Sequence, residues 1–458
     1  GMVGQTTSVD EFLDSNTSWF GFGKYQVKKV LLISGGAWWV VGWQVLALSF
    51  LVDKLKKNGY DGPDPRQKSA MDSALFVGWG FGCAVLSRLS DQRGRRPIFL
   101  VSLAGMIISS LFVSFSSDGF WWAFCRAGTG FFVGGFGLVS YVLQAEFTPS
   151  KHSVTVGVLM NGSWAVGAVV LSLVAYMAPS AEALVVLITV PAIVLFLSDK
   201  RIPESPKWLV VQRRGQQALE VLSRIAIVND QELDSDVELD LPPATSDAGS
   251  VRTLFSGSLA RQTIVMCFNW FVTSMVYYGL TLNPKATGNS DLYVSNALNA
   301  IVELVGYLVA GPIINKLGRK LALTVFFAIG GACLLALIVV SDVDGITLLV
   351  LIGKLAISSA FVAVYVVASE VFPTEVRNLG AGVCSLAARV GAFSATLIQT
   401  GFGEDLTGPR VVYALFGLGA AALTAMLLKD TRRSAQVPTP DTPGTQLQER
   451  ADKADDAL

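Results

Sequence analysis

The sequence predicts an all-α membrane protein with twelve transmembrane helices, arranged as two six-helix bundles that are related by a pseudo-two-fold repeat. Of its 458 residues, 52% are hydrophobic and only 15% are charged, whereas soluble domains carry about 25% charged residues. Apolar runs about 20 residues long, enough to cross a bilayer, recur along the chain. Two short motifs also recur at one constant spacing, which indicates two copies of one membrane unit.

The repeat rests on a loop motif and a helix-end motif. The loop SDQRGRRP around Gly94 shares its Gly-Arg core with NKLGRK around Gly318, and the two glycines are 224 residues apart. EFTP, which begins at Glu146, and EVFP, which begins at Glu370, are separated by the same 224 residues. Two unrelated motifs are not expected to share one offset by chance.

The first copy is expected at 29–198, after a polar cytoplasmic segment at 1–28. Each apolar run in this copy is assigned to one spanning helix, because about 20 apolar residues cross the hydrocarbon core. The expected spans are 29–52, 71–89, 98–116, 120–143, 154–177 and 183–198.

The second copy is expected at 262–428. A cytoplasmic linker at 199–261 separates the copies, and its stretch 214–228 has the pattern of an amphipathic helix. The tail at 429–458 is polar and rich in Pro, so we expect it to be disordered in the cytoplasm. The expected spans are 262–283, 293–314, 321–341, 346–368, 379–401 and 410–428.

Lys and Arg residues are distributed unequally between the two ends of the predicted helices. With the amino terminus inside, 23 lie on the cytoplasmic side and 7 on the other, and this bias orients membrane proteins. We therefore expect both termini in the cytoplasm, with the protein in a plasma membrane or in the membrane of an intracellular vesicle or vacuole. A basic cluster at 54–68 departs from the bias.

Two charged residues are predicted near the middle of the membrane, where ionisable groups are costly and indicate function. Glu303 and Arg389 each lie ten residues into a predicted helix, about 15 Å deep. Carriers built from two repeats bind their substrates at this depth. The counterparts in the first copy, Trp79 and Ala165, carry no charge. The alternative is a Glu303–Arg389 ion pair that only holds helices together.

Two further buried cations are interpreted as structural. Arg126 and Lys354 are predicted nearer the outer face than Glu303 and Arg389. We expect each of them to donate hydrogen bonds to helix carbonyl groups, or to extend its aliphatic part so that the charged group reaches the outer membrane surface.

Aromatic and amide side chains are predicted at the depth of the central charges. Aromatic rings bind organic cations by about 0.5–2 kcal/mol each, but helix packing explains any single ring equally well. Tyr277 and Tyr278 are the stronger candidates, because a buried hydroxyl needs a polar partner. The candidate substrate-binding residues are Glu303, Arg389, Tyr277, Tyr278, Trp270, Asn161, Trp164, Phe361, Tyr365 and Trp39.

No catalytic, cofactor-binding or metal-binding pattern is found in the sequence, so we do not expect an enzyme. A phosphate-binding loop is missing, which leaves ATP-driven pumping unsupported, and the formal net charge of zero gives no reason to expect nucleic-acid binding. The expected partners are a small organic ion and the lipid bilayer, with a proton or Na+ as the candidate coupling ion. We expect a monomer.

Several motifs together resemble the major facilitator superfamily, and more narrowly its organic cation, organic anion and carnitine transporters and the related synaptic-vesicle proteins. The DQRGRR loop marks the superfamily, whereas PESPKWL from Pro203 and EVFPTEVRNLG from Glu370 are typical of the narrower family. YYGL from Tyr277 and ALNAIVE, which ends at Glu303, match as well. The resemblance covers about residues 20–430 and implies transport by alternating access.

The resemblance also implies a substrate class. The position of Glu303 is acidic in cation and carnitine carriers, and the position of Arg389 is Arg in anion and carnitine carriers. The combination is similar to that of a carnitine transporter, with Glu303 facing an ammonium and Arg389 a carboxylate. The loop at 53–70 is short and free of Cys, as in the vesicle-protein branch. An organic anion or organic cation carrier, or a transport-inactive binding or receptor protein, are the alternatives.

The same resemblance implies a network of charges at the cytoplasmic ends of the helices. Asp91 is expected to stabilise the outward-open state through contacts with neighbouring helix ends, including the helix at 379–401. A role in orienting the chain in the membrane is the alternative. The expected members are Asp91, Arg93, Gly94, Arg95, Arg96, Glu146, Glu204, Gly318, Arg319, Glu370 and Arg377.

Overall fold

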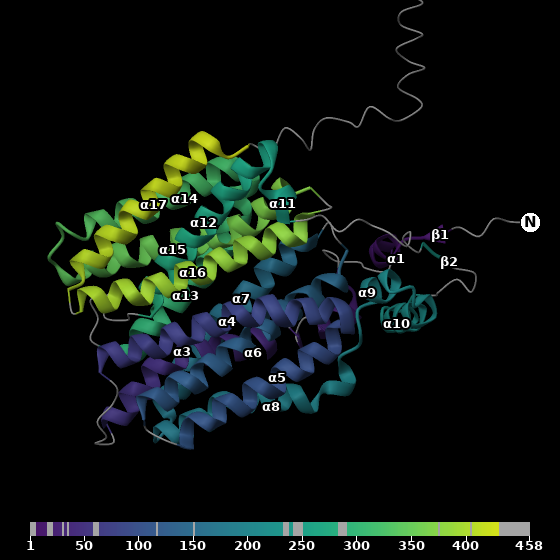
Figure 1. Cartoon of the computed structure of the whole chain (residues 1–458), viewed down its shortest axis with the longest axis horizontal. Coiled ribbons are helices and arrows are strands. Elements are labelled where there is room, and N and C mark those ends of the chain that lie inside the picture. Colours follow the sequence, from purple (N-terminus) through teal and green to yellow (C-terminus); the bar gives the residue numbers. More distant parts are fainter. Residues whose placement is uncertain are drawn as a thin grey trace, which may run out of the picture.

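The computed structural model describes residues 6–15, 22–29, 32–33, 36–57, 64–115, 118–149, 152–231, 238–240, 251–282, 291–373, 376–403 and 405–429. Within these ranges eleven helices are long and apolar enough to span a membrane, and the shorter apolar helix α8 (Ala181–Leu197) completes a set of twelve. Figure 1 shows the long helices lying side by side in one elongated body. The expected all-α membrane fold with twelve spanning helices is confirmed.

The helices form two groups that follow the order of the chain. The first group contains α3 (Gly36–Lys57), α4 (Pro65–Arg93), α5 (Arg95–Phe112), α6 (Gly119–Glu146), α7 (Ser153–Met177) and α8. The second contains α12 (Gly257–Thr281), α13 (Leu292–Leu317), α14 (Arg319–Ala336), α15 (Val343–Val371), α16 (Arg377–Phe402) and α17 (Thr407–Leu427). The two groups meet where α4 packs against α16 and where α7 packs against α13. In Figure 1 the first group is coloured purple to blue and the second teal to yellow.

The helices extend beyond the apolar runs that predicted them, because a helix continues into the headgroup region until a cap ends it. α4 begins at a capping box in which the Asp64 side chain accepts from the Gln67 N–H and Gln67 bonds back to the Asp64 N–H. It therefore starts six residues before the expected 71. α3 is the largest departure: it begins at Gly36 rather than at 29, because Lys29 ends a separate short helix.

The internal repeat is visible in the backbone. Gly94 and Gly318 have positive φ angles of 108° and 88°, which disfavour residues with a Cβ. Each of these glycines ends one helix and starts the next. The ion pairs between Arg95 and Glu146 (3.2 Å) and between Arg319 and Glu370 (2.9 Å) are also equivalent by the repeat. The two copies thus share one loop architecture.

Helices α4 and α6 cross at very short range in the first group. A Cβ added at Gly78 or Gly82 would lie 2.0 and 1.8 Å from carbonyl oxygens of α6, and one added at Gly130 would lie 2.0 Å from the Leu75 oxygen. Such a crossing is possible only with small residues. It fixes the α4 backbone beside α6 and so positions the side chains that α4 directs toward the second group.

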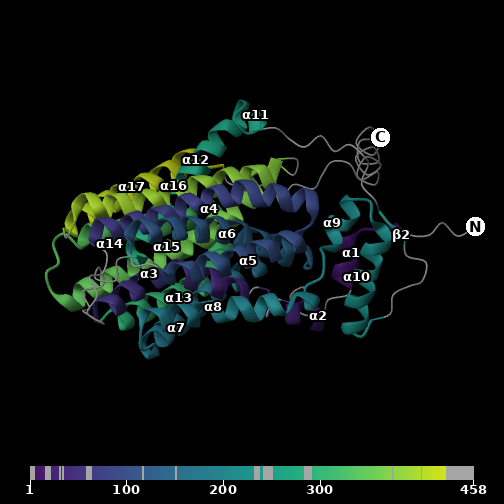
Figure 2. The same ribbon diagram turned by 60° about the horizontal axis from the view of Figure 1, so that its bottom comes forward.

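The segment before the first span and the linker between the groups fold together into a unit that we call the terminal module. Figure 2 places α1 between α9 and α10 at one end of the helix body. Strands β1 and β2 pair in parallel. The module consists of β1 (Thr6–Thr7), α1 (Val9–Ser15), α2 (Lys24–Lys29), α9 (Pro206–Val211), α10 (Gly215–Val228) and β2 (Glu238–Leu239).

The terminal module has its own apolar contacts. Val9, Phe12 and Leu13 share one face of α1 and are buried, as are Leu222 and Ile225 on α10. The amphipathic helix expected at 214–228 is therefore present as α10. The polar segment expected at 1–28 contains the short amphipathic helix α1, which that expectation did not include. The tail expected to be disordered lies, apart from Lys429, outside the described residues.

The terminal module distinguishes the two ends of the body. We call the end that carries it the terminal face and the end where α3 stops and α4 starts the opposite face. From the bias in Lys and Arg we expect the terminal face to be cytoplasmic.

A labelling experiment tests this orientation. Arg66→Cys lies on the opposite face and Arg224→Cys in the terminal module, and both native side chains are exposed. In intact cells, a membrane-impermeant maleimide should label the first variant, and label the second only after permeabilisation. The background is the chain with its five cysteines replaced by Ala. Labelling of both variants from one side would contradict the topology.

Candidate functional site

A small cavity lies between the two groups of helices, near the middle of the body. Its volume is about 30 Å³, which is room for about one water molecule. Side chains from α3, α4 and α7 form one wall, and side chains from α12, α13, α15 and α16 form the other. The lining residues are Trp38, Trp79, Asn161, Trp164, Tyr277, Tyr278, Tyr307, Phe361, Tyr365 and Arg389.

Seven of the ten candidate substrate-binding residues line this cavity: Arg389, Tyr277, Tyr278, Asn161, Trp164, Phe361 and Tyr365. Trp270 stands behind them, with its ring 4.4 Å from that of Tyr365 in an edge-to-face contact. Trp39 does not line the cavity. It stacks on Trp43 at 6.3 Å, while its neighbour Trp38 faces the cavity, because adjacent helix positions point about 100° apart.

Besides Trp38, two further cavity residues, Trp79 and Tyr307, were not among the candidates. The sequence contains a signal for both. Trp79 is the repeat counterpart of Glu303 and therefore lies at similar depth, and Tyr307 follows Glu303 by four residues on the same helix face. Both residues could therefore have been predicted from the position of Glu303, by including uncharged aromatic residues among the candidates.

Arg389 brings an uncompensated positive charge to the cavity. Its guanidinium carbon lies 4.1 Å from the centroid of the Trp79 ring, a cation–π contact. The side chain is buried, and its Nε and Nη1 atoms have no hydrogen-bond partner in the described part of the chain. No salt bridge joins it to a described carboxylate. A buried cation without a counter-ion is costly, so this position favours an anionic ligand group.

Glu303 does not pair with Arg389. Its Oε1 atom lies 2.8 Å from the Lys354 Nζ, and both side chains are almost fully buried. Its Oε2 atom accepts a 2.8 Å hydrogen bond from the Tyr277 hydroxyl. Tyr277 was an expected partner of Glu303, whereas the Glu303–Arg389 pair weighed as an alternative is contradicted. Glu303 therefore lies behind Tyr277 and not on the cavity wall.

Lys354 was expected to bond helix carbonyls or to extend outward. Its Nζ does donate to the Tyr277 carbonyl, at 3.3 Å, and also to the Thr281 hydroxyl. The main partner of Lys354, the carboxylate of Glu303, was not predicted from the sequence. α15 begins at Val343, three residues before the predicted start. Lys354 therefore lies eleven residues after the start of its helix. Glu303 also lies eleven residues after the start of its own helix, at Leu292. Equal depth on adjacent helices brings the two charges together.

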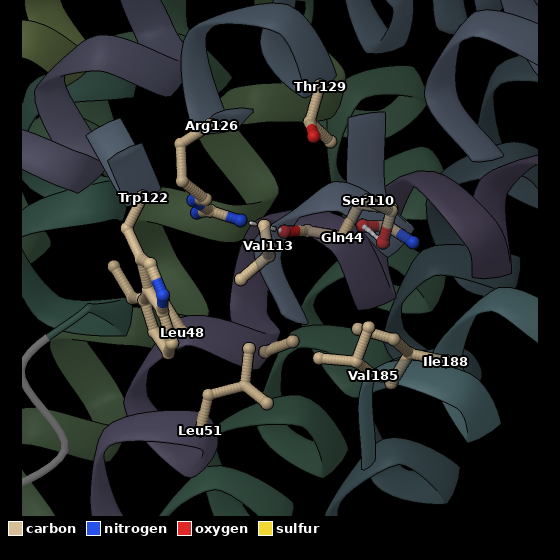
Figure 3. Close-up of a pocket in the computed structure, with 11 residues that line it drawn as sticks. Gln44, Leu48, Leu51, Ser110, Val113, Trp122, Arg126, Thr129, Val185 and Ile188 are labelled. Carbon is tan, nitrogen blue, oxygen red and sulfur yellow. Dashed lines mark hydrogen bonds between the residues drawn. The ribbon is translucent and has the colours of Figure 1, made fainter. Parts of the chain in front are cut away.

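Arg126 forms a buried cluster inside the first group of helices. It donates to the backbone carbonyls of Gln44 and Val45, as expected, and it pairs with Asp72 at 3.5 Å. Asp72 also accepts from Lys68 at 3.0 Å. Figure 3 shows Arg126 pointing toward Gln44, and both residues line a hollow with a volume of about 10 Å³. Arg126 and its partners all belong to one group of helices, which supports the interpretation of Arg126 as structural.

Tyr293, at the start of α13, closes the opposite face by placing its ring against the first group. The ring stacks on Phe50 at 5.4 Å and meets Tyr176 edge-on at 5.7 Å. Its hydroxyl donates to Asp53 Oδ2 at 2.8 Å, and Asp53 also pairs with Lys57 at 2.9 Å. We call these five residues the opposite-face seal.

Other polar contacts between the two groups lie at the same end. The hydroxyls of Ser73 and Thr396 are 2.5 Å apart, and Asn296 donates to the Ser172 hydroxyl at 2.8 Å. All four residues lie within about two turns of a helix end at the opposite face. The structure is therefore closed toward the opposite face.

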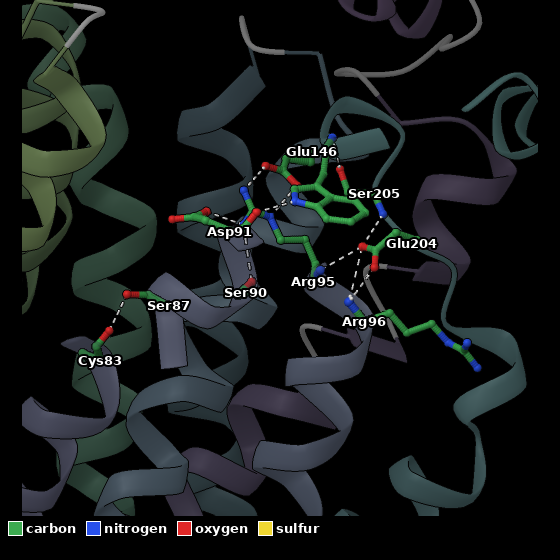
Figure 4. Close-up of polar contacts among 10 residues, drawn as sticks. Cys83, Ser87, Ser90, Asp91, Arg95, Arg96, Glu146, Glu204 and Ser205 are labelled. Carbon is green, nitrogen blue, oxygen red and sulfur yellow. Dashed lines mark hydrogen bonds and ion pairs between the residues drawn. The ribbon is translucent and has the colours of Figure 1, made fainter. Parts of the chain in front are cut away.

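At the terminal face the expected charge network is built within each copy. Arg95 pairs with both Asp91 and Glu146, and the Glu204 carboxylate accepts from the backbone N–H groups of Arg95 and Arg96 at 3.0 and 3.2 Å. Figure 4 shows this arrangement. Burial raises the pKa of Glu204, although these N–H groups and the Arg95 charge oppose the shift.

Gly94 is required beside this carboxylate. An added Cβ would lie 2.4 Å from the Glu204 Oε2. Gly318 occupies the equivalent position in the second copy, next to the Arg319–Glu370 pair. Arg93 is exposed and makes none of these contacts, and the side chain of Arg377 lies outside the described part of the chain.

Comparison with known proteins places this architecture. Residues 38–433 match the family model "Sugar (and other) transporter". Solute carrier family 22 member 15 of Xenopus tropicalis is 32% identical over 82% of this chain and 71% of its own length. The organic cation transporter protein of Drosophila melanogaster is 31% identical over 81% and 70%. The xylose transporter XylE from E. coli, in a partially occluded inward open conformation, superimposes with a TM-score of 0.68 over 89% of this chain and 98% of its own, at 15% identity.

The cavity between two groups of membrane helices and these matches together define a membrane transporter and not an enzyme. The chain belongs to the major facilitator superfamily and, within it, to solute carrier family 22, the family of the organic cation transporters.

The opposite-face seal predicts that removal of the Tyr293 hydroxyl favours the state that is open toward the opposite face. Tyr293→Phe keeps the ring contacts but removes the hydrogen bond to Asp53. Hydrogen bonds to charged groups contribute about 1.5–3 kcal/mol, and partial exposure places this one at the lower end. The open state should become about ten-fold more populated. The rate at which an impermeant maleimide reaches Asn161→Cys from the opposite face measures this change.

Tyr176→Phe is the matched control for that experiment. The Tyr176 ring also contacts Tyr293, but its side chain is largely exposed. This variant should leave the labelling rate unchanged. Equal rates in Tyr293→Phe and the parent would show that the hydrogen bond does not hold the seal.

The Glu303–Lys354 pair predicts a non-additive effect on stability. Lys354→Met leaves a buried carboxylate without its counter-ion, which should lower the free energy of unfolding by about 3–5 kcal/mol. The double variant Glu303→Gln/Lys354→Met should recover much of this loss. Thermal unfolding of the purified protein measures both. Additive losses in the double variant would exclude a direct ion pair. Lys68→Met, which removes a lysine that is 25% exposed from its pair with Asp72, serves as the control and should cost less.

Proposed function

We propose that this chain transports small zwitterions of carnitine type, which carry a quaternary ammonium and a carboxylate, by alternating access. The observation that carries the proposal is the Arg389 guanidinium, buried without a carboxylate partner among the described residues, at the wall of an aromatic cavity. The relatives support membrane transport and the organic cation family. The substrate class is the one that the resemblance implies, and the charge and the aromatic rings of the cavity support it.

Arg389 is suited to the carboxylate. A guanidinium binds a carboxylate through two parallel hydrogen bonds, and two of its nitrogen atoms lack partners. Within the second group, Lys354 neutralises Glu303, so Arg389 leaves one positive charge at this depth. A substrate carboxylate would supply the missing counter-ion.

The aromatic rings are suited to the ammonium. Trp38, Trp164, Tyr278 and Tyr365 surround the same cavity, and aromatic faces attract quaternary ammonium groups by about 0.5–2 kcal/mol each. The role first assigned to Glu303 changes, because Tyr277 and Lys354 already occupy its oxygens. We propose that Glu303 holds Tyr277 in place and does not contact the substrate.

The cavity must enlarge before a substrate binds, because it now has room for about one water molecule. Toward the terminal face, the rings of Tyr141 and Tyr365 lie 6.3 Å apart across the two groups. This contact is much smaller than the opposite-face seal with its polar contacts. We propose that a substrate enters this state from the terminal face by separation of these two rings.

An organic anion carrier is the second candidate. The same unpaired charge of Arg389 favours it, since a substrate with a net negative charge would neutralise the cavity without needing a cation. The two candidates differ in what they require of the rings: a zwitterion needs the aromatic faces for its ammonium, whereas an anion needs only Arg389.

The charge proposal predicts a change of selectivity in Arg389→Gln. Transport of L-carnitine should weaken by the loss of one desolvated charge contact, about 2–5 kcal/mol, which is about 30-fold or more in affinity. Choline, which has no carboxylate, should be affected far less. Uptake of carnitine, choline and benzoate into proteoliposomes, with and without proton and Na+ gradients, measures selectivity and coupling together.

Arg389→Lys and Trp164→Leu separate the two candidates. Arg389→Lys keeps the charge but loses the paired geometry, and should lie between the parent and Arg389→Gln. Trp164→Leu should weaken carnitine and choline but spare benzoate if the zwitterion proposal holds. Benzoate as the best substrate of the parent would favour the anion carrier, and an equal loss of choline and carnitine in Arg389→Gln would contradict both.

A further inference from the structure

A cluster of cations at the terminal face has no role in the proposed transport site. Lys28 and Lys29 end α2, Lys200 and Arg201 belong to the 3₁₀ turn η4 (Asp199–Arg201) after α8, and Arg224 lies on α10. We call these five residues the interfacial basic cluster. Three segments far apart in the sequence contribute to it.

The contacts join these segments directly. Lys29 Nζ donates to the backbone carbonyl of Arg201 and lies 5.1 Å from the centroid of the Tyr25 ring. The charge of Arg224 acts on the hydroxyl of the same tyrosine. Tyr25 thus lies beside cations of α2 and α10, and Lys29 links this position to η4.

No carboxylate in the described part of the chain forms an ion pair with a member of the cluster. Asp230 pairs with Lys24 instead, and Glu204 accepts from backbone N–H groups. Glu220 lies one helical turn before Arg224 on α10 but is not within ion-pair distance of it. The side chain of Asp199 is not among those described. Burial, and then the neighbouring charge of Arg201, lower the pKa of Lys29, as expected for crowded cations.

The position of the cluster in the membrane indicates its ligand. Leu197, the last residue of α8, is apolar and 76% exposed, so we expect it to face lipid. Arg201 follows one turn later, which puts it at the expected depth of the headgroups, and α2 precedes the first span. Basic pockets at this depth bind the headgroups of anionic lipids.

We propose that the interfacial basic cluster binds the phosphate of an anionic membrane lipid between α2, η4 and α10. The acyl chains lie along the exposed apolar surface of α8, which favours a lipid over a free phosphate ion. The bound lipid neutralises the crowded cations and ties the first span, the sixth span and the linker helix together at the terminal face.

Lipid binding to the purified full-length chain tests this site. Nanodiscs of phosphatidylcholine are compared with nanodiscs that also contain phosphatidylglycerol, and native mass spectrometry counts retained phosphatidylglycerol. Each cation near a membrane surface strengthens binding about five-fold, so Lys29→Gln/Arg201→Gln/Arg224→Gln should weaken it about 100-fold. Thermal stability should rise with phosphatidylglycerol in the parent and not in the triple variant.

A matched control separates a site from general surface charge. Arg261→Gln/Lys316→Gln/Lys320→Gln removes three cations from the terminal face of the second group and should retain lipid as the parent does. Lys29→Arg, which keeps the charge, should also retain it and shows that α2 tolerates substitution. Equal loss in both triple variants would overturn the site. Stabilisation by inorganic phosphate alone, at the level reached with phosphatidylglycerol, would overturn the assignment to a lipid.

Discussion

The contact between Lys354 and Glu303 determines the charge of the central cavity. Without it, the negative charge of Glu303 would remain uncompensated at this depth and would offset the positive charge of Arg389. The two charges are 2.8 Å apart and both are buried, so the carboxylate is neutralised inside the second group of helices. Arg389 is then left with the Trp79 ring as its neighbour. An ion pair that never touches the cavity thus decides which ligand charge the cavity favours.

The two copies of the repeat have diverged at the positions that form this pair. Glu303 and Lys354 correspond to Trp79 and Gly130 in the first copy. There, Gly130 lets α6 approach the α4 backbone so closely that an added Cβ would lie 2.0 Å from the Leu75 oxygen. The first copy therefore joins its helices by backbone contact and directs Trp79 to the cavity. The second joins α13 and α15 through charge, while both copies keep the same Gly-Arg loop at the terminal face.

The sequence predicted the spans and most of the cavity, because both follow from patterns that are local or repeated. Apolar length placed twelve helices, and depth along each helix selected Arg389, Tyr277 and Tyr278. Partner choice was harder. The predicted start of α15 was three residues too late, so Lys354 and Glu303 were predicted at different depths. On the first span, Trp39 was predicted to face the cavity, whereas its neighbour Trp38 does so. The partners of buried charges depend on helix rotation and on caps such as Asp342, which lie outside the apolar runs.

The placement of these contacts relative to the two groups of helices determines which of them change during transport. Glu303, Lys354 and Tyr277 all belong to the second group, so a movement of one group against the other leaves their contacts intact. Trp79 and Arg389 belong to different groups, as do the Tyr293 and Asp53 of the seal. Under the alternating access proposed above, the two groups would rock and the Trp79 ring would move relative to the guanidinium as the seal opens. A substrate carboxylate would then replace the cation–π contact, whereas an empty carrier would leave Arg389 buried beside Tyr278 without a counter-ion. Binding at Arg389 would in this way be coupled to the conformational cycle, and binding at Glu303 would not be.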